Sequence, residues 1–428
     1  ATASWLAQAE DSIFPVSTYS VLVSTYNGSA WSPPVVLDSG PTRPDSLFDV
    51  AMNATSTAVY VWDSPDNDLI KASIYDGSAW STPENLSLPG QDASDPAVSM
   101  DSLGNAIAVW VGSDGLNNIT QASIYDGSTW STPENLSLPG QDVVRNAKHR
   151  PQVSSDNLGT LGTSFAVWVR SDGSNDIVQA SIYDGSAWST PENLSLPGQD
   201  GQLPQVGSDA SGNAIVAWQQ VDGTTYTIYA SRYDGSAWST PIALSAPGIS
   251  LDQQFNSLNL SVNAFGQAIA VWQQSRNVHT ATYNDNTWSS AENLSPPGID
   301  TKGAQISLNA AGNAVSVLRS YFDFATIEAS TNAVLFPSPL LVLCGKVLSE
   351  NRLFKVNRIH QICWKALDIH AINSYKIKVG GLTIKTISSL EPPLVEFKNR
   401  IPGIPITYEV VALNNNGIEL TRSTVTLN

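Results

Sequence analysis

Cysteine, methionine, histidine and charge are all scarce in this 428-residue sequence. It has 2 Cys, 2 Met and 4 His, and charged residues make up only 14% of it. None of the histidines, His149, His279, His360 and His370, lies at metal-ligand spacing from another, and no HExxH, GxSxG, P-loop or EF-hand pattern occurs. The sequence therefore predicts no metal site, no cofactor and no common catalytic motif. It also has no apolar run of about 18 residues, which excludes a membrane-spanning helix.

The two cysteines, Cys344 and Cys363, both lie in the last quarter of the chain. In an exported protein, two cysteines of one small β domain can form a disulfide, whereas in a reducing compartment they stay free. Sequence alone does not give their separation in space. Both alternatives, a disulfide and a pair of half-buried thiols, stay open.

Positive charge is rare in the first three quarters of the chain. Residues 1–334 carry 10 Lys and Arg against 32 Asp and Glu, a net charge of −22, while residues 335–428 carry a net charge of +5. An acidic surface repels phosphate backbones, so we expect no nucleic-acid partner for the first part. The modest basic excess of the last part is either solvated or in contact with an acidic surface.

A repeat of about 50 residues dominates what is present. Residues 72–92 read ASIYDGSAWSTPENLSLPGQD, recur at 122–142 with one change and recur unchanged at 180–200. Weaker copies flank these three. The tryptophans that mark the copies are spaced by 49, 50, 58, 50 and 50 residues: Trp31, Trp80, Trp130, Trp188, Trp238 and Trp288. Self-similarity at this period is typical of repeat architectures, including propellers.

A second tryptophan precedes each of these markers, at the end of an Ala-Val-Trp type or similar strand. These residues are Trp5, Trp62, Trp110, Trp168, Trp218 and Trp272. Each unit contains four short strand-like runs separated by turn sequences such as Ser-Asp-Gly and Asp-Gly-Ser. The second run, such as residues 106–111, is apolar on both faces and must be covered on both sides. Blades packed radially around an axis provide that cover, and tryptophans would fill the gaps between them.

We therefore predict an all-β chain whose residues 1–337 form a β-propeller. Seven copies of the apolar strand, counting a last copy with Leu318 in the tryptophan position, predict seven blades. A six-bladed ring with shared closing strands is the alternative.

The turn before each marker tryptophan resembles a known motif. Residues 73–80, SIYDGSAW, are similar to the Asp-box of sialidase-like and related bacterial propellers, Ser-x-Asp-x-Gly-x-x-Trp, with the aspartate displaced by one residue. The resemblance covers about 330 residues and implies a propeller fold. In the families it resembles, this box is a structural hairpin remote from the active site. It therefore implies little about function.

The remaining residues, 338–428, resemble a fibronectin type III domain. Trp364 lies early in this part, Tyr375 in the middle and Tyr408 before a Leu-Asn-Asn-Asn-Gly segment, as core aromatics and a late hairpin do in such domains. The resemblance implies a β-sandwich that acts as a spacer or adhesion module.

One unit departs from the repeat. The stretch before Trp168 is eight residues longer than in its neighbours, and residues 143–150 read VVRNAKHR. Its basic residues, Arg145, Lys148, His149 and Arg150, are the candidate binding residues, on a loop expected at the propeller face that commonly binds ligands. The alternative is a tolerated surface insertion held by the acidic field around it.

The sequence favours a binding protein over an enzyme. A sialidase would need converging arginines and an Arg-Ile-Pro motif, but the motif occurs only at residues 400–402, outside the predicted propeller. Three nearly identical units offer the same groups three times, which suits multivalent binding better than a single axial active site. A sialidase-like glycosidase is the least favoured function.

We predict a secreted or cell-surface bacterial module that binds a protein or glycan on the propeller face. The start, Ala-Thr-Ala, fits removal of an export signal as well as it fits trimming of the chain. A multivalent lectin and a structural surface-assembly protein are the two alternatives. The sequence does not indicate the oligomeric state.

Overall fold

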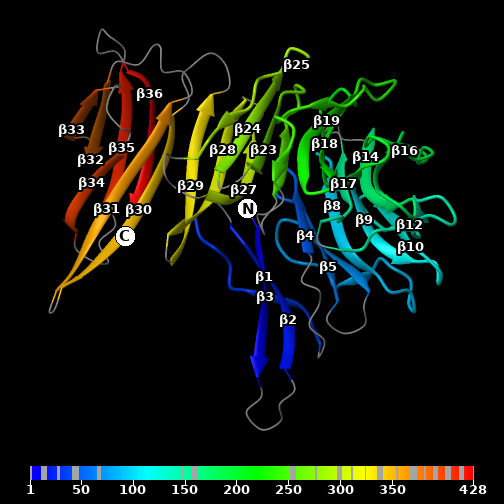
Figure 1. Ribbon diagram of the computed structural model, residues 1–428. Coiled ribbons are helices and arrows are strands. Elements are labelled where there is room, and N and C mark those ends of the chain that lie inside the picture. The colour runs from blue at the N-terminus through cyan, green and yellow to red at the C-terminus, as the bar shows by residue number, and fades with distance from the viewer. Residues whose placement is uncertain are drawn as a thin grey trace. The chain divides into compact units, whose positions relative to one another are not determined.

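The computed structural model describes most of the chain as β-strands and turns (Figure 1). The described residues are 2–10, 17–26, 29–40, 48–64, 69–146, 148–155, 162–250, 257–274, 277–295, 301–309, 312–322, 324–334, 341–352, 355–366, 374–379, 382–388, 394–400, 406–413 and 419–427. No helix occurs among these residues, so the prediction of an all-β chain is confirmed.

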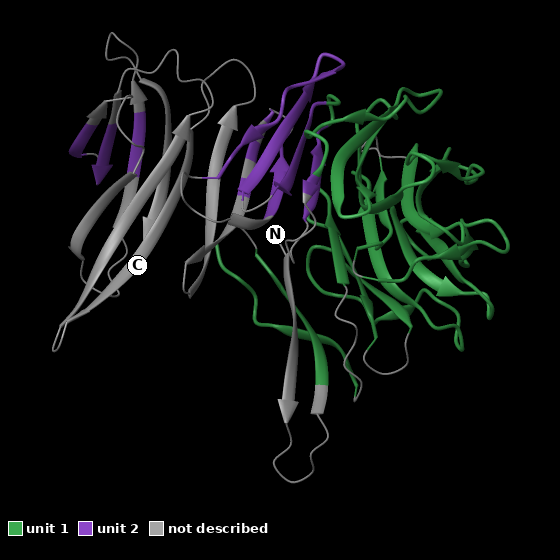
Figure 2. Cartoon of the chain, in the orientation of Figure 1, with its two compact units in different colours: residues 1–248, 264–266 green, residues 249–263, 267–428 purple. Residues whose placement is uncertain are grey.

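The chain divides into two compact units (Figure 2). The first comprises residues 1–248 and 264–266, and the second residues 249–263 and 267–428. The domain boundary predicted at residue 337 lies within residues 335–340, which are outside the described part of the chain.

The first unit contains a series of antiparallel sheets that repeat one strand order. A three-stranded sheet, the β1–β3 sheet, comes first and four sheets with four or more strands follow it. The first two sheets comprise β1 (Thr2–Glu10), β2 (Ser17–Thr25), β3 (Val35–Gly40), and β4 (Phe48–Met52), β5 (Ala58–Asp63), β6 (Ile70–Tyr75), β7 (Glu84–Asn85). The next comprises β8 (Ser94–Met100), β9 (Ala106–Ser113), β10 (Asn118–Tyr125), β11 (Glu134–Asn135). The last two comprise β12 (Asp142–Val143), β13 (Gln152–Ser155), β14 (Ser164–Ser171), β15 (Asp176–Tyr183), β16 (Glu192–Asn193), and β17 (Asp200–Ser208), β18 (Ala214–Asp222), β19 (Thr225–Tyr233), β20 (Ile242–Ala243).

The fourth strand is only two residues long in β7, β11, β16 and β20, whereas β3 has six residues. The run WSTPENLS forms only the two-residue strand β7, in which Glu84 pairs with Ala72 and Asn85 with Lys71. The proline of this run does not set the length, because the copy at residues 288–295 has Ala291 in its place and still forms only the two-residue strand β26 (Glu292–Asn293).

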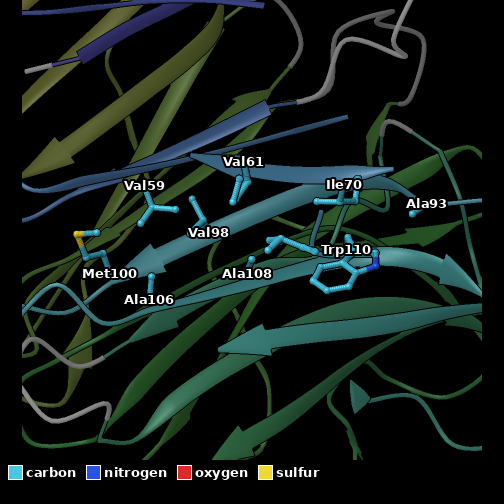
Figure 3. Packing of buried hydrophobic residues seen from close by; sticks show 11 residues of the cluster. Val59, Val61, Ile70, Ala93, Val98, Met100, Ala106, Ala108 and Trp110 are labelled. Carbon is cyan, nitrogen blue, oxygen red and sulfur yellow. The ribbon is translucent and has the colours of Figure 1, made fainter. Parts of the chain in front are cut away.

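In the repeats whose side chains are described, the second strand is buried along its length, as β5, β9, β14 and β18 show. In β9, alternate residues point to opposite sides of the sheet. Ala106, Ala108 and Trp110 pack with Val59 and Val61 of the preceding sheet, which Figure 3 shows from close by.

The other face of β9 packs against the following sheet. Ile107, Val109 and Val111 pack with Ala166 and Trp168 of β14. Successive sheets in this unit are therefore stacked face to face, with an apolar layer between each pair.

Four strand tryptophans lie inside these layers: Trp62, Trp110, Trp168 and Trp218. Trp62 is 1% exposed and the other three are 0% exposed, as is Trp272 of the second unit. Burying an indole stabilises a fold by several kcal/mol at about 25 cal/mol per Å². These residues are therefore a large source of cohesion between the sheets.

The second unit has four sheets. The first two comprise β22 (Leu258–Val262), β23 (Ala268–Gln274), β24 (Asn277–Asn284), β25 (Thr287–Trp288), β26 (Glu292–Asn293), and β27 (Thr301–Leu308), β28 (Asn313–Phe322), β29 (Phe324–Val334). Between these two sheets, Ile269 and Val271 of β23 pack with Ala304 and Ala314. The other two have the strand orders β30-β31-β34 and β33-β32-β35-β36. Their strands are β30 (Leu341–Arg352), β31 (Lys355–Ala366), β32 (Ser374–Val379), β33 (Leu382–Ser388), β34 (Leu394–Arg400), β35 (Ile406–Leu413) and β36 (Glu419–Leu427).

The two cysteines face each other across one strand pair. Cys344 of β30 lies directly opposite Cys363 of β31 in the register. Their side chains are outside the described part of the structure, so the predicted disulfide stays a prediction.

Candidate functional site

The turn that resembles the Asp-box is a hairpin organised by its aspartate. Asp76 Oδ1 accepts hydrogen bonds from Ser78 N at 2.7 Å, Ser78 Oγ at 2.7 Å and Ala79 N at 2.9 Å. These bonds, that from Ala79 first, lower the pKa of Asp76 to about 2. The carboxylate of Asp76 therefore forms its hydrogen bonds within its own turn. The same bonds recur at Asp126, Asp184 and Asp234.

Two serines fasten the chain that leaves this turn. Ser73 Oγ donates to the carbonyl of Ser81 at 2.8 Å, and Ser81 Oγ accepts from the N–H of Ile74 at 3.0 Å. These bonds replace part of the sheet ladder that the short fourth strand does not supply. The turn is thus held rigidly against its own sheet.

Each turn presents a tyrosine and a tryptophan in contact. The ring centroids of Tyr125 and Trp130 are 5.3 Å apart and tilted by 42°, and those of Tyr183 and Trp188 are 5.4 Å apart and tilted by 47°. Equivalent pairs occur in the other repeats. The tryptophans Trp80, Trp130, Trp188, Trp238 and Trp288 are half-buried, and Trp31 is 52% exposed.

A carboxylate of the preceding sheet lies beside two of these pairs. Burial raises the pKa of Tyr125, and the negative charges of Glu84 and Asp126 raise it further. Glu84 is an exposed residue of β7, on the neighbouring sheet.

The next junction repeats this arrangement. Burial, Glu134 and Asp184 raise the pKa of Tyr183 in the same way, and Glu134 is an exposed residue of β11. An exposed carboxylate beside a half-buried aromatic pair can accept hydrogen bonds from hydroxyl groups while a ring face contacts C–H groups.

A third junction has its glutamate in the same register, but the ring of Phe165 also contacts its aromatic pair, with centroids 5.5 Å from Tyr233 and 6.0 Å from Trp238. Glu192 of β16 pairs with Ala180, as Glu84 pairs with Ala72 and Glu134 with Ala122. Trp238 packs on the apolar layer between this sheet and the next. We call these three places, each with a glutamate of one sheet and a Tyr–Trp pair of the next, the aromatic junctions.

The four basic candidates of the 143–150 segment have different environments. Arg145 forms an ion pair with Asp92, with 2.6 Å between Nη1 and Oδ2. The side chain of Lys148 is exposed, while its carbonyl accepts a hydrogen bond from Leu203 N at 2.7 Å.

Arg150 reaches two other sheets. Its Nε donates to the carbonyl of Pro96 at 3.1 Å, and its Nη2 donates to the carbonyls of Pro96 and Phe48, the latter at 3.0 Å. The guanidinium also faces Asp49. Burial raises the pKa of Asp49, whereas Arg150 and two backbone N–H groups oppose that shift.

His149 is buried, with 4% of its surface exposed. Its Nε2 lies 3.4 Å from Oδ2 of Asp176. Burial lowers the pKa of His149 to about 4, Lys148 lowers it too, and Asp200 opposes them. The imidazole is therefore neutral near pH 7.

The segment thus connects sheets rather than extending away from them. Arg145, His149 and Arg150 point to protein groups of neighbouring strands, and Lys148 is the exposed basic side chain among the four. The sequence does mark this segment, because part of the eight extra residues before Trp168 lies in it. Its contacts, and the aromatic junctions formed between sheets, could not be found from the linear sequence.

No metal centre is evident in the described part of the chain. Within it, no three or more His, Cys, Asp or Glu side chains are placed to hold a metal ion. The described residues also contain no helix that is long and apolar enough to cross a membrane.

Comparisons with known proteins relate the chain to solved structures at low similarity. No family model and no curated protein sequence matches it. A lectin from Aleuria aurantia, in complex with Fucα1-6GlcNAc, is 14% identical, with 66% of this chain and 90% of that chain covered and a TM-score of 0.41. An ulvan lyase of a new polysaccharide lyase family is 12% identical, with 74% and 89% covered and a TM-score of 0.44.

The β-propeller domain of the Trilobed protease from Pyrococcus furiosus, described as having an open velcro topology, is also similar. It is 8% identical, with 78% of this chain and 92% of that chain covered and a TM-score of 0.43. The similar proteins thus include propellers, a lectin and enzymes, and they do not distinguish between functions.

Proposed function

We propose that this chain is a non-enzymatic binding module that takes glycans at the three aromatic junctions. The observation that carries the proposal is the repeated pairing of an exposed glutamate with a Tyr–Trp pair of the next sheet, at Glu84 with Trp130 and at Glu134 with Trp188. The junction of Glu192 with Trp238 has its glutamate in the same register and a Tyr–Trp pair on the next sheet.

The residue types suit a neutral sugar. An indole or phenol ring packs against the C–H face of a pyranose, and a carboxylate accepts hydrogen bonds from its hydroxyl groups. The net charge of −22 over residues 1–334 disfavours anionic saccharides. Three equivalent sites support multivalent binding, in which weak single sites add to a strong total attachment.

The wider proposal places these junctions on a propeller. Stacked four-stranded sheets of one repeated order support a ring of blades, seven by the count of apolar strands. The Ser-Asp-Gly-Trp hairpins support the Asp-box assignment. In the last part of the chain, the strand orders β30-β31-β34 and β33-β32-β35-β36 support a fibronectin type III sandwich that serves as a spacer. Secretion or display at a bacterial surface would place such a module next to glycans.

Glycan-array screening followed by calorimetry tests the function. We expect the intact chain to bind a neutral glycan with a stoichiometry near three sugars per chain. The combined variant E84Q/E134Q/E192Q should lose most of this binding, because an amide is a weaker acceptor than a carboxylate. The variant E292Q is the matched control. Glu292 of β26 pairs with Thr280 of β24, just as Glu84 pairs with Ala72, but it is not part of the three aromatic junctions.

Two outcomes would contradict the proposal. One is a folded protein that binds no glycan on the array. The other is a glycan that binds the combined variant and the intact chain equally well.

A further inference from the structure

The buried strand tryptophans share one requirement, an acceptor for the indole N–H. In four sheets a side-chain oxygen accepts it. The bonds are Trp62 to Asp38 at 3.0 Å, Trp110 to Gln121 at 3.0 Å, Trp218 to Gln220 at 2.9 Å and Trp272 to Gln274 at 3.4 Å. A buried polar group without a partner costs about 1–3 kcal/mol, which explains why an acceptor is supplied to these four tryptophans.

The residue two positions after the tryptophan decides how the acceptor is supplied. Gln220 and Gln274 occupy this position and accept the bond themselves. In β9 the position is Gly112, and a Cβ added there would lie 2.3 Å from Gln121 Oε1. Glycine therefore makes room for Gln121 to reach Trp110.

The β14 strand breaks this rule because the same position is Arg170. Arg170 has the Cβ that Gly112 lacks in the neighbouring repeat, and its guanidinium has donors only. Gln179 lies opposite Trp168 in the register, just as Gln121 lies opposite Trp110. Among the residues that the structure describes, however, neither Trp168 Nε1 nor Gln179 Oε1 has a hydrogen-bond partner.

Two more unpartnered groups lie at β14, on Arg170 itself and on Gln141, which immediately precedes the Asp142 that pairs with Ser171. Gln141 Oε1 is buried without a partner in the described structure, although the equivalent Gln91 Oε1 lies 3.5 Å from Gln121 Nε2, which donates to it. Arg170 Nε is also buried without a partner. Gln179 keeps its other bond, since its Nε2 donates to Asn193 Oδ1 at 2.9 Å.

We propose that an internal water molecule binds at Trp168. Two donors, Trp168 Nε1–H and Arg170 Nε–H, and two acceptors, Gln179 Oε1 and Gln141 Oε1, match the two lone pairs and two hydrogens of one water. Buried waters typically make about three hydrogen bonds to such groups. An anion would leave the two amide oxygens unpaired, and a cation would face two N–H groups, so the site selects a neutral molecule that both donates and accepts.

Water contacts of the indole protons test the proposal in the full chain. In perdeuterated, ¹⁵N-labelled protein, the Hε1 signal of Trp168, assigned by its loss in W168F, should show a cross-relaxation peak with a long-lived water. The Hε1 signal of Trp110, assigned in W110F, is the internal control and should show none. A crystal structure should place an ordered water within hydrogen-bond distance of Trp168 Nε1.

The variant R170Q provides the second arm. A glutamine at this position accepts the indole bond directly in two other sheets, so the water peak of Trp168 should be lost in R170Q. A Trp168 Hε1 without a water peak in the wild-type chain, or a crystal structure in which Trp168 Nε1 bonds directly to a protein oxygen, would overturn the proposal. Because these wild-type measurements decide by themselves, the test does not depend on the folding of R170Q.

Discussion

At the scale of single residues, His149 couples the 143–150 segment to pH. Its pKa in the folded chain is about 4, below its ordinary value of 6.5, because burial disfavours the imidazolium. As the pH falls, His149 is therefore protonated near pH 6.5 in the unfolded chain but only near pH 4 in the folded chain. The stability that the neutral imidazole contributes is fully present above pH 6.5 and is lost as the pH falls toward 4.

We expect the free energy of unfolding of the first unit to fall by up to about 3 kcal/mol between pH 7 and pH 4 through this group. Denaturant titrations at pH 7, 5.5 and 4.5 measure it. H149Q, which cannot titrate, should show a flatter profile. Burial raises the pKa of the neighbouring Asp176, and this shift has the opposite sign, so the comparison with H149Q isolates the histidine. Parallel profiles for the two proteins would refute the assignment.

The cysteine pair offers a second residue-scale prediction. Residues directly opposite each other in an antiparallel pair have Cα atoms about 4.5–5.5 Å apart, within the range of a disulfide. Because Cys344 and Cys363 are opposite, we expect no free thiol in protein from an oxidising compartment and two after reduction. The C344S/C363S variant should be less stable by about 3 kcal/mol in the last part of the chain. Free thiols in denatured, unreduced protein would exclude the bond.

At the scale of elements, the 143–150 segment fastens neighbouring sheets together. Arg150 donates to carbonyls of Pro96 and Phe48, on two sheets that precede its own. Replacing its planar fork by an ammonium group, as in R150K, loses some of these bonds and leaves buried carbonyls unpaired. We expect a loss of about 1–3 kcal/mol in the free energy of unfolding of the first unit.

The matched control for this loss is K148Q in the same segment. Lys148 is exposed, so K148Q should change stability by less than about 0.5 kcal/mol. Thermal or denaturant unfolding compares the three proteins. If R150K and K148Q were equally stable, the segment would be a surface insertion without a fastening role.

The elements also show what the sequence can and cannot reveal. The apolar run of residues 106–111 predicted a strand covered on both faces, because no exposed strand is apolar on both sides, and β9 confirms it. The fourth run of the repeat, WSTPENLS, forms only a two-residue strand, and its proline is not the reason, since the copy WSSAENLS forms an equally short one. The contact of Arg150 with Phe48 spans 102 residues, and no local pattern encodes such a contact.

The candidate site was predictable only in part for the same reason. Trp130 and Glu84 are both visible in the repeat, but they belong to different copies of it. Comparing the copies of the repeat identifies the residues that recur. It does not show that a residue of one copy contacts a residue of the next copy. The junctions emerge only when the sheets are stacked.

At the scale of the whole molecule, near-identical repeats make valency the property to measure. If the three aromatic junctions bind sugar independently, the affinity of one junction for a monovalent sugar does not change when the other two junctions are lost. A surface dense in glycan, in contrast, holds the intact chain through several junctions at once. Linked binding of this kind exceeds single-site affinity by about 10²–10⁴-fold.

The variant E134Q/E192Q, which keeps Glu84, separates these effects. We expect calorimetry with a monovalent sugar to give an unchanged dissociation constant and a stoichiometry lowered from three to one. Dissociation from a glycan-coated sensor should be faster by about 100-fold or more, because rebinding through the lost junctions no longer holds the chain. If the dissociation rate from the coated surface were the same for both proteins, the junctions would not act together, and the repeated hairpins would serve the fold alone.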